Sequence, residues 1–214
     1  MKTHFLHMKL IFCDLNAQMI KAWNKSFSED PIITIHHGSI FEINSDAIVS
    51  PANSFGFMDG GLDLQISNFF GWHVQERLQE IIKKKYYGEL LVGCAEIVET
   101  DHKKIPYIIS APTMRVPMIL KESVNVYLAT RAVLLLVKYG TFSNGSLIRE
   151  KVKKLAIPGM GTGVGRLSYE ICALQMKKAV DNFFYEKYHF PKTWYEAQKN
   201  HQLLYRKSTT DLQF

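Results

Sequence analysis

The sequence predicts an α/β domain with three layers, in which helices cover both faces of a mostly parallel β-sheet. Short apolar runs of strand length alternate with segments that repeat apolar residues at helical spacing, and this alternation is typical of such folds. Two glycine-rich loops directly follow predicted strands, at the sheet edge where ligands of open α/β sheets bind. The length of 214 residues suits one domain with a full hydrophobic core.

The predicted strands are short apolar runs bounded by polar or turn-forming residues. They cover residues 10–13, 32–36, 47–49, 95–99, 107–111 and 155–157. The predicted helices place apolar side chains three or four residues apart, as Met19, Trp23 and Phe27 illustrate. They cover residues 17–27, 64–70, 74–85, 124–139, 168–185 and 192–206. Ser168 stands where the N-cap of a helix is expected. The last helix is amphipathic but lacks a dense basic stripe, so we expect it to pack on the domain and not on a membrane.

Charge and cysteine content narrow the class of protein. The net charge of +6 favours anionic partners, but the Lys/Arg clusters are short and mixed with acidic residues, so we do not expect a nucleic-acid partner. Cys13, Cys94 and Cys172 are far apart in the sequence, which argues against a disulfide framework or a zinc site and for a reducing compartment. The chain has no signal-peptide pattern and no apolar stretch of membrane-spanning length. We therefore expect a cytoplasmic protein.

The first glycine-rich loop covers residues 50–63 and leads from a strand into a helix. Its Gly60-Gly61 pair allows positive φ angles and a close approach of the backbone to a ligand. Just before a helix, such a pair exposes N–H groups where the helix dipole is positive, and this predicts an anion site.

The same loop carries three side chains, Asn53, Asp59 and Asp63, that can bind hydroxyl groups. A carboxylate beside an anion site is useful if it binds sugar hydroxyls or orients a water molecule. The structural alternative is that Asp59 forms a turn and Asp63 caps the helix. Taken alone, this loop leaves both interpretations open.

The second glycine-rich loop covers residues 158–166 and also leads from a buried strand into a helix. Its four glycines are Gly159, Gly161, Gly163 and Gly165. A bare backbone of this kind can wrap a phosphate, and Thr162 adds a hydroxyl group and Arg166 a charge. No Gly-Lys-Ser/Thr follows, as a P-loop requires, and the loop lies too late in the chain for a dinucleotide fingerprint. Two phosphate-type loops at one sheet edge predict a ligand with two phosphates between them.

The motifs in these loops resemble the macrodomain family. Residues 33–41 and 46–53 resemble its opening strand, its Gly-Asp-Ile turn and its Asp-Ala-Ile-Val-Asn-Ala-Ala-Asn segment. The run 60–63 matches Gly-Gly-Val-Asp, and residues 155–165 match the strand and loop ending in Thr-Gly-Val. The matches extend from about 32 to 184, within a single domain of residues 1–214 that has a strand–helix addition at 9–27 and a helical tail at 190–214. The loop segments resemble a mainly bacterial, uncharacterised branch.

The resemblance implies a mixed central sheet and a cleft for ADP-ribose. By position, Asn53 contacts the distal ribose and Asp63 lies near it, where hydrolytic members orient a water that attacks the anomeric carbon. The implied catalytic residues are Asn53, Asp59 and Asp63. The implied binding residues are Ser39, Ile40, Ala52, Gly60, Gly61, Gly161, Thr162, Gly163, Val164, Gly165 and Arg166.

Three positions depart from the family pattern. Ser39 replaces the aspartate that usually binds the adenine amino group, which removes a charge-assisted hydrogen bond about twice as strong as a neutral one. Ser50 replaces the first asparagine of Asn-Ala-Ala-Asn, and Gly165 replaces an aromatic residue that packs on the distal ribose. We expect a more open distal pocket, unless Arg166 or a phenylalanine fills it.

Two weaker signals lie near the same edge. Arg115 stands between two prolines after a predicted strand; it could reach a phosphate bidentately or belong to an ordinary rigid loop. We expect His36, His37 and His73 to be structural or at the surface.

Three functions fit the sequence. The first is hydrolysis of an ADP-ribosyl bond on a protein or a small molecule, with no metal or cofactor, because positioned water and a preorganised anion site can supply the rate. The second is a reader module that binds ADP-ribose without chemistry. The third is binding of another nucleotide-like ligand by a scaffold whose partner docks on the terminal additions.

Overall fold

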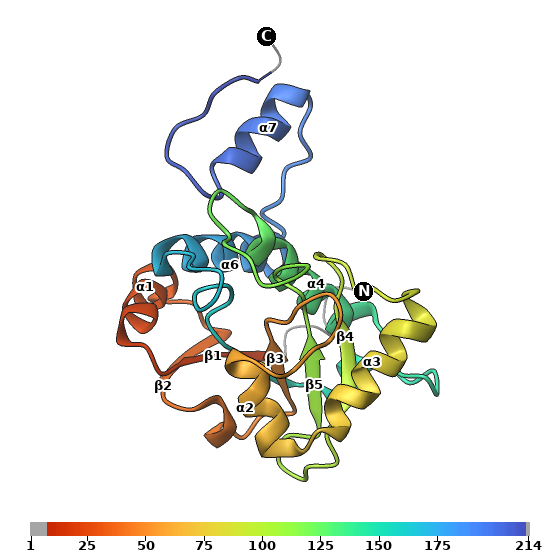
Figure 1. The fold of residues 1–214 in the computed structure, drawn as a ribbon. Coiled ribbons are helices and arrows are strands. Elements are labelled where there is room, and N and C mark those ends of the chain that lie inside the picture. Colours follow the sequence, from red (N-terminus) through yellow and green to blue (C-terminus); the bar gives the residue numbers. More distant parts are fainter. Residues whose placement is uncertain (1–7, 213–214) are drawn as a thin grey trace.

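The computed structural model describes residues 8–212 and contains one six-stranded sheet. The strands are β1 (Lys9–Asp14), β2 (Ile33–His37), β3 (Ala47–Ser50), β4 (Glu96–Glu99), β5 (Tyr107–Ser110) and β6 (Lys154–Ile157). Their order is β2-β1-β6-β3-β5-β4, and neighbours are parallel except for the antiparallel pair β4 and β5 (Figure 1). The mixed sheet that the family resemblance implied is confirmed.

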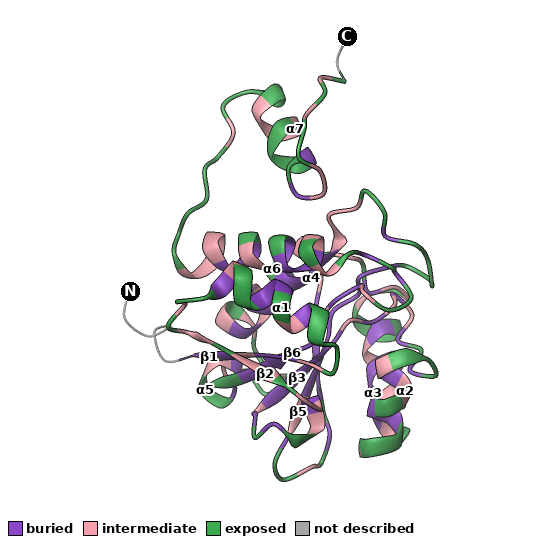
Figure 2. Cartoon of the chain, turned by 90° about the vertical axis from the view of Figure 1, so that its left-hand side faces the viewer, coloured by how far each residue is buried: buried purple, intermediate pink, exposed green. Residues whose placement is uncertain are grey.

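Helices cover both faces of the sheet, as predicted. They are α1 (Ala17–Phe27), α2 (Gly61–Phe70), α3 (His73–Lys85), α4 (Asn125–Tyr139), α5 (Ile148–Lys151), α6 (Tyr169–Phe184) and α7 (Trp194–Gln202), with a 3-10 turn at Ile40–Glu42. Helices α1, α4 and α6 lie on one face, and α2 and α3 on the other (Figure 2). Two apolar cores result, one on each side of the sheet.

Alternate residues of a strand pack into opposite cores. In β3, Ala47 and Val49 pack into the core beneath α1, α4 and α6, whereas Ile48 packs into the core beneath α2 and α3. Successive side chains of a strand point to opposite faces, so a strand covered on both sides needs a continuous apolar run. Short uninterrupted runs of this kind could be identified in the sequence for this reason.

The N-terminal strand and helix are part of the central structure. Strand β1 lies between β2 and β6, pairing Leu10 with Ile33 on one side and with Leu155 on the other. Phe12 is fully buried, and its ring lies 5.3 Å from that of Trp23 and 5.0 Å from that of Phe27, both on α1. This unit precedes the family-like segment in sequence, but it supplies an inner strand of the sheet.

Helix ends follow local chemistry where a cap is present. Ser168 is the N-cap of α6, and its hydroxyl accepts a hydrogen bond from the Ile171 amide at 3.3 Å, as predicted. The four-residue helix α5 and the 3-10 turn were not predicted, because neither is long enough to show a helical period.

The C-terminal helix is shorter than predicted and stands beside the body of the domain (Figure 1). The turn after α7 attaches it, because Leu204 is buried and its carbonyl accepts a hydrogen bond from Gln175 Nε2 at 3.2 Å. Trp194 at the start of α7 is 65 % exposed. The tail therefore packs on the domain at one end only.

Candidate functional site

A cavity of about 340 Å³ opens at the edge of the sheet where β3 and β6 end. Both glycine-rich loops line it: Gly60 and Gly61 on one side, and residues 161–165 on the other. The two loops therefore converge on one space, because β3 and β6 are parallel neighbours whose carboxyl ends lie together. The volume is at the lower end of the range for small-molecule sites, roughly 300 to 1,000 Å³.

The first loop presents bare backbone to this cavity. Gly60 is the N-cap of α2 and has no side-chain capping bond, and Gly61 has a φ angle of +56°. A Cβ atom added at either position would meet nothing within 4 Å. The N–H groups of the first turn of α2 have no partner within that helix, and they lie where the helix dipole attracts an anion.

The second loop combines packing with an open backbone. A Cβ atom at Gly161 would lie 2.7 Å from Leu120 Cδ1, and one at Gly165 would lie 2.5 Å from the Gly161 carbonyl oxygen. Gly163, between them, has nothing within 4 Å. The outer glycines thus allow the turn to form, and the middle one leaves room for a ligand.

Asp63 is the buried acid of the site. Its side chain is 8 % exposed, and its carboxylate accepts a hydrogen bond from the hydroxyl of Ser50 at the end of β3. Burial raises the pKa of Asp63 from 3.8 to about 6; the Ser50 hydrogen bond opposes this increase, and the charge of Asp59 adds to it. Asp63 does not cap α2, so the structural alternative considered for it does not describe its contacts.

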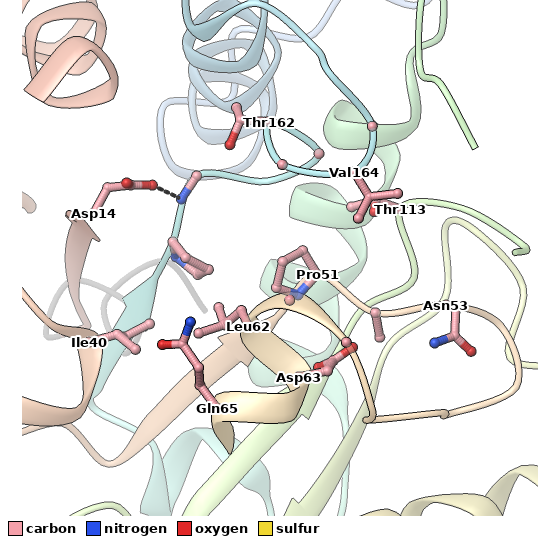
Figure 3. Close-up of a pocket in the computed structure, with 18 of the residues that line it drawn as sticks. Asp14, Ile40, Pro51, Asn53, Leu62, Asp63, Gln65, Thr113, Thr162 and Val164 are labelled. Atoms are coloured by element: carbon pink, nitrogen blue, oxygen red, sulfur yellow. Dashed lines mark hydrogen bonds between the residues drawn. The ribbon is translucent and has the colours of Figure 1, made fainter. Parts of the chain in front are cut away.

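Asn53 lines the cavity, but its side chain also holds the loop together. Its Oδ1 accepts hydrogen bonds from the amides of Phe55 at 3.1 Å and Phe57 at 3.2 Å, and its Nδ2 donates to the Phe57 carbonyl at 2.7 Å. Asp59 is exposed and also lines the cavity. Asn53 and Asp63 lie toward one end of the pocket, and Asp14 and Ile40 toward the other (Figure 3).

Most of the other predicted binding residues line the same cavity. They are Ser39, Ile40, Ala52, Thr162 and Val164. The Ser39 hydroxyl accepts a hydrogen bond from the Phe41 amide at 3.3 Å and caps the 3-10 turn.

Arg166 and Arg115 lie outside the cavity lining. Arg166 is exposed and has a φ angle of +50°. Arg115 forms a bidentate ion pair with Glu89 at 2.6 and 2.9 Å and covers the Phe55 ring at 5.2 Å. Its guanidinium therefore stabilises the loop, which agrees with the rigid-loop interpretation.

Asp14 is a site residue that the sequence reasoning missed. It ends β1, and its Oδ2 accepts a hydrogen bond from the Gly159 amide at 3.1 Å (Figure 3). Its Oδ1 accepts a hydrogen bond from the Asn16 amide at 2.8 Å. Asp14 also lines the cavity. Its position at the carboxyl end of a predicted strand could have identified it, because ligands of open α/β sheets bind at that edge. The same rule had identified the two loops.

The described part of the chain contains neither a metal-binding cluster nor a helix that could span a membrane. Among residues 8–212, no group of three or more His, Cys, Asp or Glu side chains could hold a metal ion. No helix in that range is long and apolar enough to cross a membrane. The three cysteines are free thiols, and burial raises the pKa of Cys13 and Cys172 to about 12.

Comparison with known proteins identifies related sequences. The family model described as Macro domain matches residues 49–176. An uncharacterized protein of Aquifex aeolicus (strain VF5) is 35 % identical over 151 residues, which cover 71 % of this chain and 82 % of that protein.

Solved structures agree with the fold. A mutant macrodomain of Oceanobacillus iheyensis with ADPR has a TM-score of 0.55 and 24 % identity, and the match covers 70 % of this chain and 76 % of that one. Thermosipho africanus DarTG in complex with ADP-ribose has a TM-score of 0.54 and 18 % identity. This match covers 78 % of the present chain and 49 % of the DarTG chain. At these identities the likeness concerns the fold alone.

Proposed function

The chain belongs to the macro domain family, and from that premise we propose that its cavity binds ADP-ribose or a derivative of it. The observation that supports this most directly is the convergence of two bare glycine-rich loops on one cavity. A diphosphate between them accepts hydrogen bonds from the first turn of α2 and from the backbone around Gly163. Both loops are preformed, so little ordering opposes binding.

The two ends of the cavity offer places for the remainder of such a ligand. The diphosphate occupies the space between the loops, one nucleoside lies toward Asp14 and Ile40, and the distal ribose lies toward Asn53 and Asp63 (Figure 3). Among the structural neighbours, one macrodomain binds ADPR, another structure is a complex with ADP-ribose, and a third contains ADP, which supports a ligand that contains an ADP unit.

The proposed reaction is hydrolysis of an ADP-ribosyl bond with Asp63 as general base. Asp63 accepts a proton from a water whose oxygen attacks the anomeric carbon of the distal ribose. The new carbon–oxygen bond replaces the bond to the leaving group, which departs with its electron pair and takes a proton from solvent. A carboxylate whose pKa burial raises to about 6 is largely ionised at pH 7 and is a stronger base than an ordinary aspartate.

A reader module without chemistry is the second candidate, and two contacts favour it. Asn53 uses its amide to hold the loop, and Asp63 already accepts a hydrogen bond from Ser50. The Asn53 amide can therefore bind a ribose hydroxyl only after the loop adjusts, and one oxygen of the Asp63 carboxylate is already occupied. Such a site binds the ligand and leaves the ADP-ribosyl bond intact.

Binding is tested first, with isothermal titration calorimetry of ADP-ribose against the wild type and Gly163→Val. The valine enters open space, so the fold is expected to remain while the diphosphate site is blocked. Ser143→Val, an exposed substitution on the loop before α5, is the matched control. Equal ADP-ribose affinity in Gly163→Val and the wild type would exclude the site between the loops.

Chemistry is tested separately, by the release of ADP-ribose from ADP-ribosylated proteins and small molecules. Hydrolysis predicts release by the wild type and none by Asp63→Asn, with ADP-ribose binding retained in both. A wild type that binds ADP-ribose but releases none from ester, acetal or N-glycosidic linkages is a reader. Full release by Asp63→Asn would remove Asp63 from the mechanism.

A further inference from the structure

A second and larger cavity lies on the helical face, away from the glycine-rich loops. Its volume is about 670 Å³, and its walls are α4, α6 and the segment from residue 186 to the turn after α7. Most of this third wall is exposed to solvent (Figure 2). It also lies beyond residues 49–176, the part that the family model matches. The cavity therefore depends on a feature outside the family core.

The charge on the walls of this cavity is mainly positive. Arg131, Lys138 and Lys178 line it, and Glu186 is the only acidic residue that does so in the described part of the chain. The Lys138 ammonium group lies over the rings of Tyr139 at 5.1 Å and Phe183 at 4.8 Å. Arg131 and Lys138 lie two helical turns apart on α4, and the packing of α6 against α4 brings Lys178 to the same cavity.

Exposed aromatic side chains accompany the cations. Tyr188 lines the cavity and is 67 % exposed, and two residues later Phe190 is 85 % exposed. Trp194, at the start of α7, is 65 % exposed and lies one helical turn before Ala197, which lines the cavity. So many exposed aromatic rings on a short segment have no role in either core, and exposed apolar surface of this kind marks a contact site.

Cations beside aromatic faces are the combination that single-stranded nucleic acids use. The backbone phosphates interact with Lys and Arg, and successive bases stack on aromatic rings without regard to sequence. An acidic peptide would use the cations but would leave the aromatic faces unoccupied. A second copy of this chain would bring the same positive charge to the cavity and repel it.

We propose that this cavity and the aromatic segment beside it form a binding site for single-stranded nucleic acid. The sequence alone led us to expect no nucleic-acid partner, because its Lys/Arg clusters are short and mixed with acidic residues; the convergence of Arg131, Lys138 and Lys178 on one cavity is the new observation. The site is separate from the cavity between the glycine-rich loops. It does not rest on the proposed ADP-ribose function.

The test is fluorescence anisotropy of a labelled oligothymidylate of about twelve nucleotides with the full-length protein. The double variant Arg131→Ala/Lys178→Ala is expected to lower the slope of log affinity against log salt by about 2, because each phosphate contact contributes about 1. Tyr188→Ala is expected to weaken binding at least about five-fold, since a stacked base is worth roughly 1 to 3 kcal/mol.

Matched controls lie elsewhere on the surface. Lys103→Ala/Lys104→Ala removes two exposed cations from the loop between β4 and β5, and Tyr87→Ala removes a tyrosine that is 96 % exposed. Both controls are expected to bind the oligonucleotide like the wild type, and all variants are expected to keep their melting temperature and ADP-ribose affinity.

Three results would overturn the proposal: no binding of the oligonucleotide by the wild type at low salt, equal losses in test and control variants, or binding of polyglutamate as tight as that of the oligonucleotide. Self-association by light scattering that Tyr188→Ala abolishes, without oligonucleotide binding, would instead assign the surface to a second copy.

Discussion

Replacing Asp63 by asparagine is expected to stabilise the folded protein at neutral pH. The carboxylate is almost fully buried, and burial raises its pKa from 3.8 to about 6. Each pKa unit corresponds to about 1.4 kcal/mol, so keeping Asp63 ionised in the fold costs about 3 kcal/mol relative to the unfolded chain. An asparagine avoids this cost and can still accept the hydrogen bond from Ser50.

The sign of the pH dependence follows from which state holds the proton. Below about pH 3 both states are protonated, and the carboxyl group costs nothing. As the pH rises from about 4 to 6, the unfolded chain releases the proton first and the folded protein retains it, so the free energy of unfolding falls. By linkage, the expected loss from Asp63 is about 1 kcal/mol at pH 4.5 and about 3 kcal/mol at pH 7.5.

The assay is urea unfolding followed by circular dichroism, for the wild type and Asp63→Asn at several pH values between 4.5 and 7.5. The free-energy difference between the two proteins should grow by about 2 kcal/mol over this range. Glu170→Gln, an exposed acid in the first turn of α6, controls for the loss of one negative charge near a helix start. A difference that is constant with pH would refute the claim that Asp63 is desolvated.

Three further outcomes can be checked by simple measurements. Ser50→Ala leaves the Asp63 carboxylate without its hydrogen bond, so we expect a loss of about 1 to 3 kcal/mol in urea unfolding at pH 7.5 and a higher pKa of Asp63. Gly161→Ala should destabilise by about 1 kcal/mol or more, because φ is +70° and Leu120 is too close; an unchanged melting temperature would contradict this. Asp14→Ala frees the Gly159 amide, and calorimetry should then record weaker ADP-ribose binding while the Asp63 pKa stays the same.

The elements that depend on local pattern could be predicted from the sequence. The buried strands form continuous apolar runs because both faces of the sheet are covered, and the Ser168 cap follows from a hydroxyl before an apolar helix. The glycine-rich loops could also be identified, because clustered glycines leave a stretch of backbone without side chains, and no other segment of comparable length contains so many. Neither α5 nor the early end of α7 follows from periodicity, since a helix of one turn has no period and the C-terminal turn depends on contacts with α6.

The contacts that set the chemistry of the cavity could not be predicted, because each joins residues from separate elements. In the sequence, Ser50 is only a departure from the family motif. In the fold, its hydroxyl donates a hydrogen bond to the buried Asp63 carboxylate. In the sequence, Asp14 is only the end of a predicted strand. In the fold, β1 lies beside β6, and the Asp14 carboxylate accepts a hydrogen bond from the Gly159 amide. The sequence therefore predicts which residues can reach the site, whereas strand order decides their partners. Since those partners control the pKa of Asp63 and the shape of the second loop, the same glycine motifs on a different strand order would form a site with different chemistry.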